Sequence, residues 1–289
     1  MRRLLSRLWR LLTAPFRLAA RPFRAVHHFL TYEPEDAPTG DVLARTLENP
    51  SGLLEHIDAL RRHLTRALLV LVATTGISFA LAPRILDFLA EPIGGIASLQ
   101  AIEVTESIGA FMRVSLLSGF ALAFPYIAAE LFAFAQPGLR RRERLLLLAA
   151  IPAGFVLFVG GMVFAFKVML PAALPFLLTF MGIRTVPRPS NYINFVTSML
   201  FWIGLAFEFP LVVYSLAAIG VVDARSLWRG WRVAIVGIGV LAAIITPTPD
   251  PVNMALVMGP MIVLYFLGVG LAAIAGRGRR RRAPDPPSR

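Results

Sequence analysis

The chain has 289 residues, of which 57% are hydrophobic and only 16% are charged. Soluble domains are about 45–50% apolar and about 25% charged, so this composition excludes an ordinary soluble protein and indicates a membrane protein. The formal net charge is +12, and the chain contains no cysteine, which excludes disulfides, thiolate metal sites and thiol catalysis.

The first thirty residues form a basic segment without an acidic side chain. Arginines alternate with leucines at nearly helical spacing, which is typical of a segment that lies on anionic lipids. A nonspecific basic tail is an almost equally good interpretation. We therefore expect a basic amphipathic arm at residues 1–30, followed by a polar linker rich in Pro and Gly at residues 31–52.

Six apolar runs follow, and a helix of about 20 residues spans a hydrocarbon core of roughly 30 Å. In chain order the runs are Ala67–Pro83, Val114–Ala129, Leu145–Phe166, Tyr192–Val222, Val233–Thr246 and Asn253–Ala275. The fifth run reaches only about 21 Å as a helix. We expect either local bilayer thinning or a buried position there, or a helix that starts earlier, near Leu227. The predicted fold is all-α, with six transmembrane helices at residues 53–275 and a disordered basic tail at residues 276–289.

Basic residues are distributed unevenly between the loops. Twenty-four of the 29 lysines and arginines precede the first run, follow the sixth, or lie between runs two and three or runs four and five. The positive-inside rule therefore predicts that both termini lie in the cytoplasm. An even number of spans also places both termini on one side, so the two arguments agree.

The sequence contains no catalytic constellation, glycine-rich phosphate loop or nucleophile elbow, and we expect no cofactor. His56 and His63 are seven residues apart, so one helical face can hold both, but no carboxylate or thiol cluster completes a metal shell. They are predicted to be surface histidines. Glu208 lies inside the fourth run, where an ionised carboxylate is costly. Glu208 is either protonated and hydrogen-bonded to a neighbouring helix, or it is a polar point inside a groove. We favour the groove.

Four segments resemble motifs of the TatC family in the expected order. Residues 53–64 (LLEHIDALRRHL) are similar to the signature HLxELRxRL, and residues 132–144 (FAFAQPGLRRRER) are similar to WAFxxPxLxxxER. Residues 207–210 (FEFP) are similar to FExP, and residues 246–250 (TPTPD) are similar to TPPD with one residue more. Each motif alone is weak, but four in the right topological places are specific.

The resemblance implies a glove-like, concave fold and the core receptor subunit of the twin-arginine translocase in a bacterial or archaeal inner membrane. Such a receptor binds signal peptides with consecutive arginines, joins TatA-type and TatB-type single-span partners, and exports folded proteins with the proton-motive force. It is a homo-oligomer within the complex, not an enzyme, and binds no nucleic acid. Two guanidinium groups need carboxylates, of which Glu143 is the first candidate. The signal-peptide site implied by the motifs comprises Asp58, Leu60, Arg61, Phe134, Pro137, Leu139 and Glu143.

The chain departs from the family pattern at three positions. The signature has an acid directly before its Leu-Arg pair, but Ala59 stands there, and the neighbouring Asp58 is rotated by about 100° around a helix. Met254 and Phe266 replace a glutamine and a glutamate that the family uses to hold partner helices. The partner interface implied by the resemblance comprises Glu208, Thr246, Asp250, Asn253 and Met254.

A small-solute transporter is the alternative function. Transporters often show inverted repeats and helices interrupted near the midplane, but no internal repeat is visible in this sequence. A membrane enzyme is not supported because the spans offer almost no paired polar groups.

Overall fold

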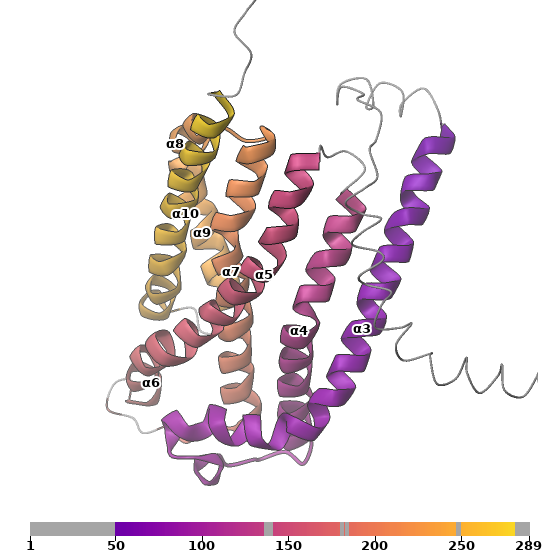
Figure 1. Ribbon diagram of the computed structural model, residues 1–289. Coiled ribbons are helices and arrows are strands. Elements are labelled where there is room, and N and C mark those ends of the chain that lie inside the picture. Colours follow the sequence, from indigo (N-terminus) through magenta and orange to yellow (C-terminus); the bar gives the residue numbers. More distant parts are fainter. Residues whose placement is uncertain (1–49, 136–140, 180–181, 183–184, 247–249, 281–289) are drawn as a thin grey trace, which may run out of the picture.

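The structure is a computed structural model that describes residues 50–135, 141–179, 182, 185–246 and 250–280. All regular elements of this part of the chain are helical (Figure 1). They are α3 (Pro50–Ala90), the short turns η1 (Glu91–Ile93) and η2 (Ile96–Ser98), α4 (Glu106–Ala135), α5 (Arg141–Phe164), the π-turn η4 (Ala165–Met169), α6 (Leu170–Thr179), α7 (Pro189–Ile219), α8 (Ala224–Arg229), α9 (Trp231–Ile245) and α10 (Pro251–Arg280). The predicted arm at 1–30, most of the predicted linker and residues 281–289 of the predicted tail lie outside the described residues.

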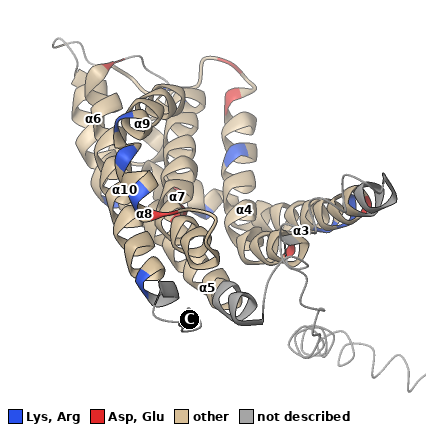
Figure 2. Ribbon diagram, turned by 90° about the horizontal axis from the view of Figure 1, so that it is seen from above, with Lys and Arg blue, Asp and Glu red and all other residues tan. Residues whose placement is uncertain are grey.

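Five helices are long and apolar enough to cross a membrane, and α9 is a shorter apolar helix. The helices α3, α4, α5, α7, α9 and α10 alternate in direction, so the first turn of α3 and the last turn of α10 lie at the same end of the bundle (Figure 1). We name this the basic end, because Arg225 and Arg229 of α8 and Arg277 of α10 lie there. Figure 2 looks onto this end and shows the blue basic segments around α8 and α10.

α3 and α4 pack closely along their length, as Figure 1 shows. The tightest point lies between Thr75 and Gly119, where a Cβ atom on the glycine would lie 2.6 Å from the Cα atom of Thr75. The hydroxyl of Thr74 donates a hydrogen bond of 2.8 Å to the carbonyl oxygen of Gly119. Small residues and hydroxyl bonds of this kind let membrane helices approach without a hydrophobic driving force between them.

The sequence suggested that the third transmembrane helix ends at Lys167, but the structure shows that it continues past this residue. The helix continues through the π-turn η4 into α6 and ends at Thr179. Lys167 lies in the π-turn, and its Nζ atom is 5.8 Å from the ring centroid of Phe88 and 5.4 Å from that of Phe166. Because aromatic faces stabilise a cation, the charge does not terminate the helix.

The fifth run forms the shorter of the two expected helices. α9 begins at Trp231, and Gly230 separates it from the six-residue helix α8. Leu227 therefore belongs to a separate element and does not extend the span.

α7 supplies much of the largest buried cluster, including Ile193, Val196 and Ile203, which are fully buried. It contacts α4, α5 and α10, so it is the central helix of the bundle.

Candidate functional site

A hydrogen-bonded contact between His63 and Glu130 joins α3 and α4 near the basic end. The Nδ1 atom of His63 lies 2.5 Å from Oε2 of Glu130, and the hydroxyl of Tyr126 donates to Oε1 of the same carboxylate over 2.6 Å. Glu130 retains 9% of its surface, whereas the side chain of His63 is 23% exposed. The carboxylate is thus held on both oxygens at the edge of the bundle.

Two aromatic contacts lie one turn further toward the basic end. The ring of His56 packs against Phe134 at a centroid distance of 4.5 Å, and His63 approaches the same ring edge-on at 6.2 Å. Both histidines therefore face α4. His56 is exposed and His63 is partly exposed, but His63 also has a partner, Glu130, 67 residues further along the chain, which only the tertiary structure shows.

The structure brings together some of the sequence-predicted signal-peptide residues. Asp58, Leu60 and Arg61 lie exposed on α3, and Phe134 lies beside that helix at the end of α4. Pro137 and Leu139 lie outside the described residues. Glu143 lies in the first turn of α5, but its side chain is not among those described.

Glu208 lies in the middle of α7 and faces α5. A Cβ atom on Gly154 would be 2.8 Å from its Oε2 atom, so the absent side chain of Gly154 makes room for the carboxyl group. Its other oxygen, Oε1, is buried and has no hydrogen-bond partner among the described residues. A buried polar atom of this kind usually finds a partner, so Glu208 is an unusual group at this depth.

The other predicted partner-interface residues lie at the end opposite the basic end. The hydroxyl of buried Thr246 donates to the carbonyl oxygen of Ala242 over 2.8 Å and closes the last turn of α9. Asp250 accepts from the backbone N–H of Asn253 at 2.7 Å and from its side-chain amide at 2.9 Å, which caps the start of α10. Met254 packs against the main hydrophobic cluster. These four residues shape the turn between α9 and α10, separately from Glu208.

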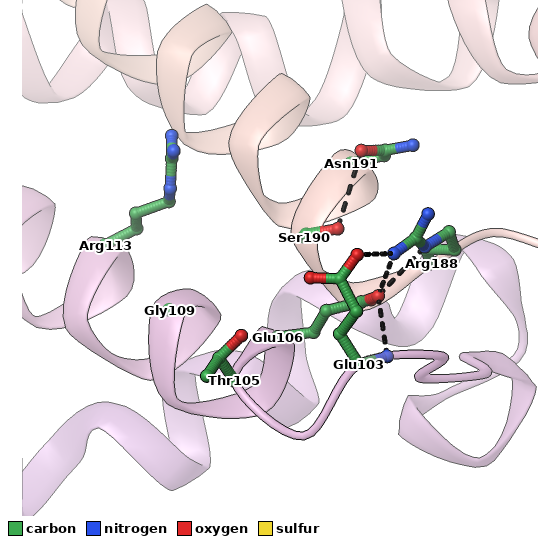
Figure 3. Close-up of a pocket in the computed structure, with 8 residues that line it drawn as sticks. All are labelled: Glu103, Thr105, Glu106, Gly109, Arg113, Arg188, Ser190 and Asn191. Carbon is green, nitrogen blue, oxygen red and sulfur yellow. Dashed lines mark hydrogen bonds and ion pairs between the residues drawn. The ribbon is translucent and has the colours of Figure 1, made fainter.

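A pocket of about 380 Å³ also lies at that opposite end, between the starts of α4 and α7 (Figure 3). Arg188 donates to Oε1 of Glu103 over 3.2 Å and, through Nε, to Oε1 of Glu106 over 2.9 Å. The Glu106 carboxylate raises the pKa of Arg188 above its usual value. Arg113 lines the pocket and donates to the side-chain oxygen of Asn194, so the two arginines tie α4 to α7 through Glu106 and Asn194.

These arrangements can bind charged groups but offer no means of catalysis. No group of three or more His, Cys, Asp or Glu side chains that could hold a metal occurs in the described part of the chain. Glu130, which contacts His63, and Tyr126, which donates to Glu130, are not among the residues predicted from the sequence. The signal that was available is the position of Glu130, a lone acid at the end of an apolar run and one turn before Phe134.

The helical fold and its long apolar helices define a class: an all-helical, multi-pass membrane protein. Comparison with solved structures gives the same fold. A crystal structure described as the twin-arginine translocase receptor TatC superimposes with a TM-score of 0.69 at 30% sequence identity, covering 76% of this chain and 99% of that one.

Sequence comparisons agree. The family model described as Sec-independent protein translocase protein (TatC) matches residues 55–260. A protein of that name from Deinococcus radiodurans is 34% identical over 245 residues, covering 80% of this chain and 91% of the relative. Another from Koribacter versatilis is 33% identical over 246 residues, covering 80% and 90%. The chain belongs to the TatC family of Sec-independent protein translocase subunits. Family membership excludes the small-solute transporter alternative, and it makes the protein a translocase component and not an enzyme.

Proposed function

We propose that this chain is the subunit that binds twin-arginine signal peptides, with its recognition site at the basic end. The observation that carries the proposal is the contact between His56 and Phe134, whose rings lie 4.5 Å apart. These residues belong to two family motifs more than seventy residues apart in sequence. Their packing joins α3 and the end of α4, and the proposed site adds the start of α5, where Glu143 lies.

Recognition of consecutive arginines requires anionic acceptors of the right shape. A carboxylate binds a guanidinium through two parallel charge-assisted hydrogen bonds, which an ammonium group cannot reproduce. Glu143 is the first such carboxylate in this proposal, and the family motif around it is the support. Asp58 is the second candidate from the sequence, with Leu60, Arg61, Phe134, Pro137 and Leu139 completing the surrounding surface.

The basic end faces the cytoplasm in this proposal. The positive-inside rule supports this orientation, because Arg225, Arg229 and Arg277 lie at that end. Signal peptides would then meet the site before export, and the basic arm at residues 1–30 would bind anionic lipids of the same leaflet.

Binding of a signal peptide tests the function directly. A synthetic peptide with two consecutive arginines, an apolar stretch and a photo-crosslinker beside the arginine pair is added to membranes that contain the full chain. We expect crosslinks to the segment around Glu143, and far fewer with a peptide in which both arginines are lysine. Equal crosslinking of the two peptides would contradict the receptor function.

Partner subunits of the TatA and TatB type bind, in this proposal, along the short helix α9 and the turn that Thr246, Asp250, Asn253 and Met254 shape. The outer face of α9 is apolar and unpartnered among the described residues, with Val233 77% and Val236 67% exposed. Because the chain has no native cysteine, single cysteines report contacts without background. Val236→Cys should form a disulfide with a cysteine in a partner helix, whereas Val156→Cys on α5, which is 68% exposed, is the matched control.

A further inference from the structure

We propose that Glu130 is the second guanidinium-binding carboxylate of this chain, in place of an acid on α3, and that His63 occupies it until an arginine arrives. This inference rests on the proposed signal-peptide function. It concerns which side chain completes the pair with Glu143, and it replaces Asp58 as the candidate for that role.

The helical geometry of α3 separates Asp58 from the site. His56, Ala59 and His63 lie within about 60° of one another around the helix, whereas Asp58 is about 140° from His63. Both histidines contact residues of α4, so their face is the one that closes against that helix. Asp58 is exposed and Ala59 is partly buried. The position at which the family motif carries its acid therefore faces α4, and Asp58 does not.

Glu130 lies on α4, and its carboxylate points toward the face of α3 that carries His56, Ala59 and His63. It lies one helical turn before Phe134, and it is bound to His63, which follows Ala59 by one turn. Together with Asp58 it is one of two carboxylates at the basic end of α3 and α4 whose side chains the structure describes. The acid absent at Ala59 thus has a replacement across the helix interface.

The hydrogen bonds of Glu130 leave room for a guanidinium group. A carboxylate has about four acceptor positions, two on each oxygen. Tyr126 uses one position on Oε1 and His63 uses one on Oε2, so one position on each oxygen remains. A guanidinium fork needs one acceptor position on each of two oxygens.

Access to the carboxylate depends on His63. Glu130 retains only 9% of its surface, whereas the His63 side chain is 23% exposed and comes from the more exposed helix. Rotation of the imidazole away from α4 uncovers the carboxylate, and an arginine then binds one acceptor position on each oxygen while Tyr126 keeps its own. Low exposure also strengthens the resulting ion pair, because less water competes for it.

The test measures the affinity of the full chain in membranes for the same twin-arginine and twin-lysine peptides. Glu130→Gln keeps the shape and removes the charge, so twin-arginine binding should weaken about tenfold or more, the effect expected when a bond to a charged group is lost. Asp223→Asn, which changes an exposed carboxylate outside the proposed site, should stay within about twofold of the native chain. The double variant Ala59→Glu/Glu130→Gln returns a carboxylate to the shared face and should restore binding.

The outcomes separate the two proposals. A native chain that does not prefer arginine to lysine contradicts the receptor function itself. A native chain that discriminates, together with a Glu130→Gln variant that binds normally, overturns only the assignment of Glu130. Loss of binding in Glu130→Gln without rescue in the double variant also overturns it, since a merely structural role gives that result. If Glu130→Gln does not accumulate in the membrane, the His63→Gln variant provides the test. Twin-arginine peptides should bind this variant equally well or more tightly, because the imidazole no longer competes for Glu130. Weaker binding overturns the proposal.

Discussion

Gly154 of α5 leaves the space that the carboxyl group of Glu208 on α7 occupies. A Cβ atom at Gly154 would lie 2.8 Å from Oε2 of Glu208, which is closer than real Cβ contacts allow. One residue without a side chain thus permits an acid in the middle of the bundle. The position of the Glu208 carboxyl group therefore depends on how α5 and α7 pack against each other.

Gly154→Ala should therefore destabilise the protein by about 1 kcal/mol, the low end for overpacking, because the added methyl group displaces the carboxyl group at the end of a flexible side chain. The check is the thermal unfolding midpoint of the full chain in detergent. Gly160→Ala is the matched control, since nothing lies within 4 Å of a Cβ atom there and the change should be neutral or slightly stabilising. If both variants unfold like the native chain, the contact with Glu208 does not limit the packing.

Glu208→Ala should impair transport more than it impairs membrane insertion or abundance. The reason is that Oε1 of Glu208 is buried without a hydrogen-bond partner among the described residues, so this atom does not hold α7 against its neighbours. The measurement compares export of a folded twin-arginine cargo with the amount of the chain in the membrane. A parallel loss of abundance and export would show that the residue is structural.

Gly119→Ala should separate α3 from α4. The added Cβ atom would lie 2.6 Å from the Cα atom of Thr75, and backbone atoms cannot rotate away as a side chain can. We expect a destabilisation of about 1–3 kcal/mol, measured by thermal unfolding. The same substitution at Gly109, on the same helix but in open space, should leave the midpoint nearly unchanged. Equal effects at the two positions would indicate a general response of α4 to alanine.

Arg188→Ala should lower the unfolding temperature, because the buried carboxylate of Glu106 then loses the arginine that ties the start of α4 to the start of α7. The double variant Arg188→Ala/Glu106→Gln should be less destabilised than the sum of the two single variants. Additive effects would show that the ion pair seen in Figure 3 contributes no coupling.

Much of the fold could be predicted because a helix that spans a membrane must be long and apolar, and such runs are visible in the sequence. The long apolar runs correspond to α3, α4, α5, α7 and α10, and the short fifth run corresponds to α9. The end of the third run could not be predicted from Lys167, because the rings that stabilise its charge come partly from α3. The sequence left open whether the fifth transmembrane helix starts near Leu227 or near Val233. The break between α8 and α9 at Gly230 favours the later start.

The sequence by itself determined the membrane class, the number of apolar helices and the family, because hydropathy, loop charge and short motifs are local properties of the chain. Only the tertiary structure decided which side chains of different helices lie against one another. It placed His63 against Glu130 and made room for Glu208 at Gly154, through contacts between residues 67 and 54 positions apart. Such contacts depend on how helices rotate and approach one another, and no local pattern in a sequence records this. The physical reason is that in a bilayer the apolar faces of helices are interchangeable, so close packing and a few polar contacts select the partners.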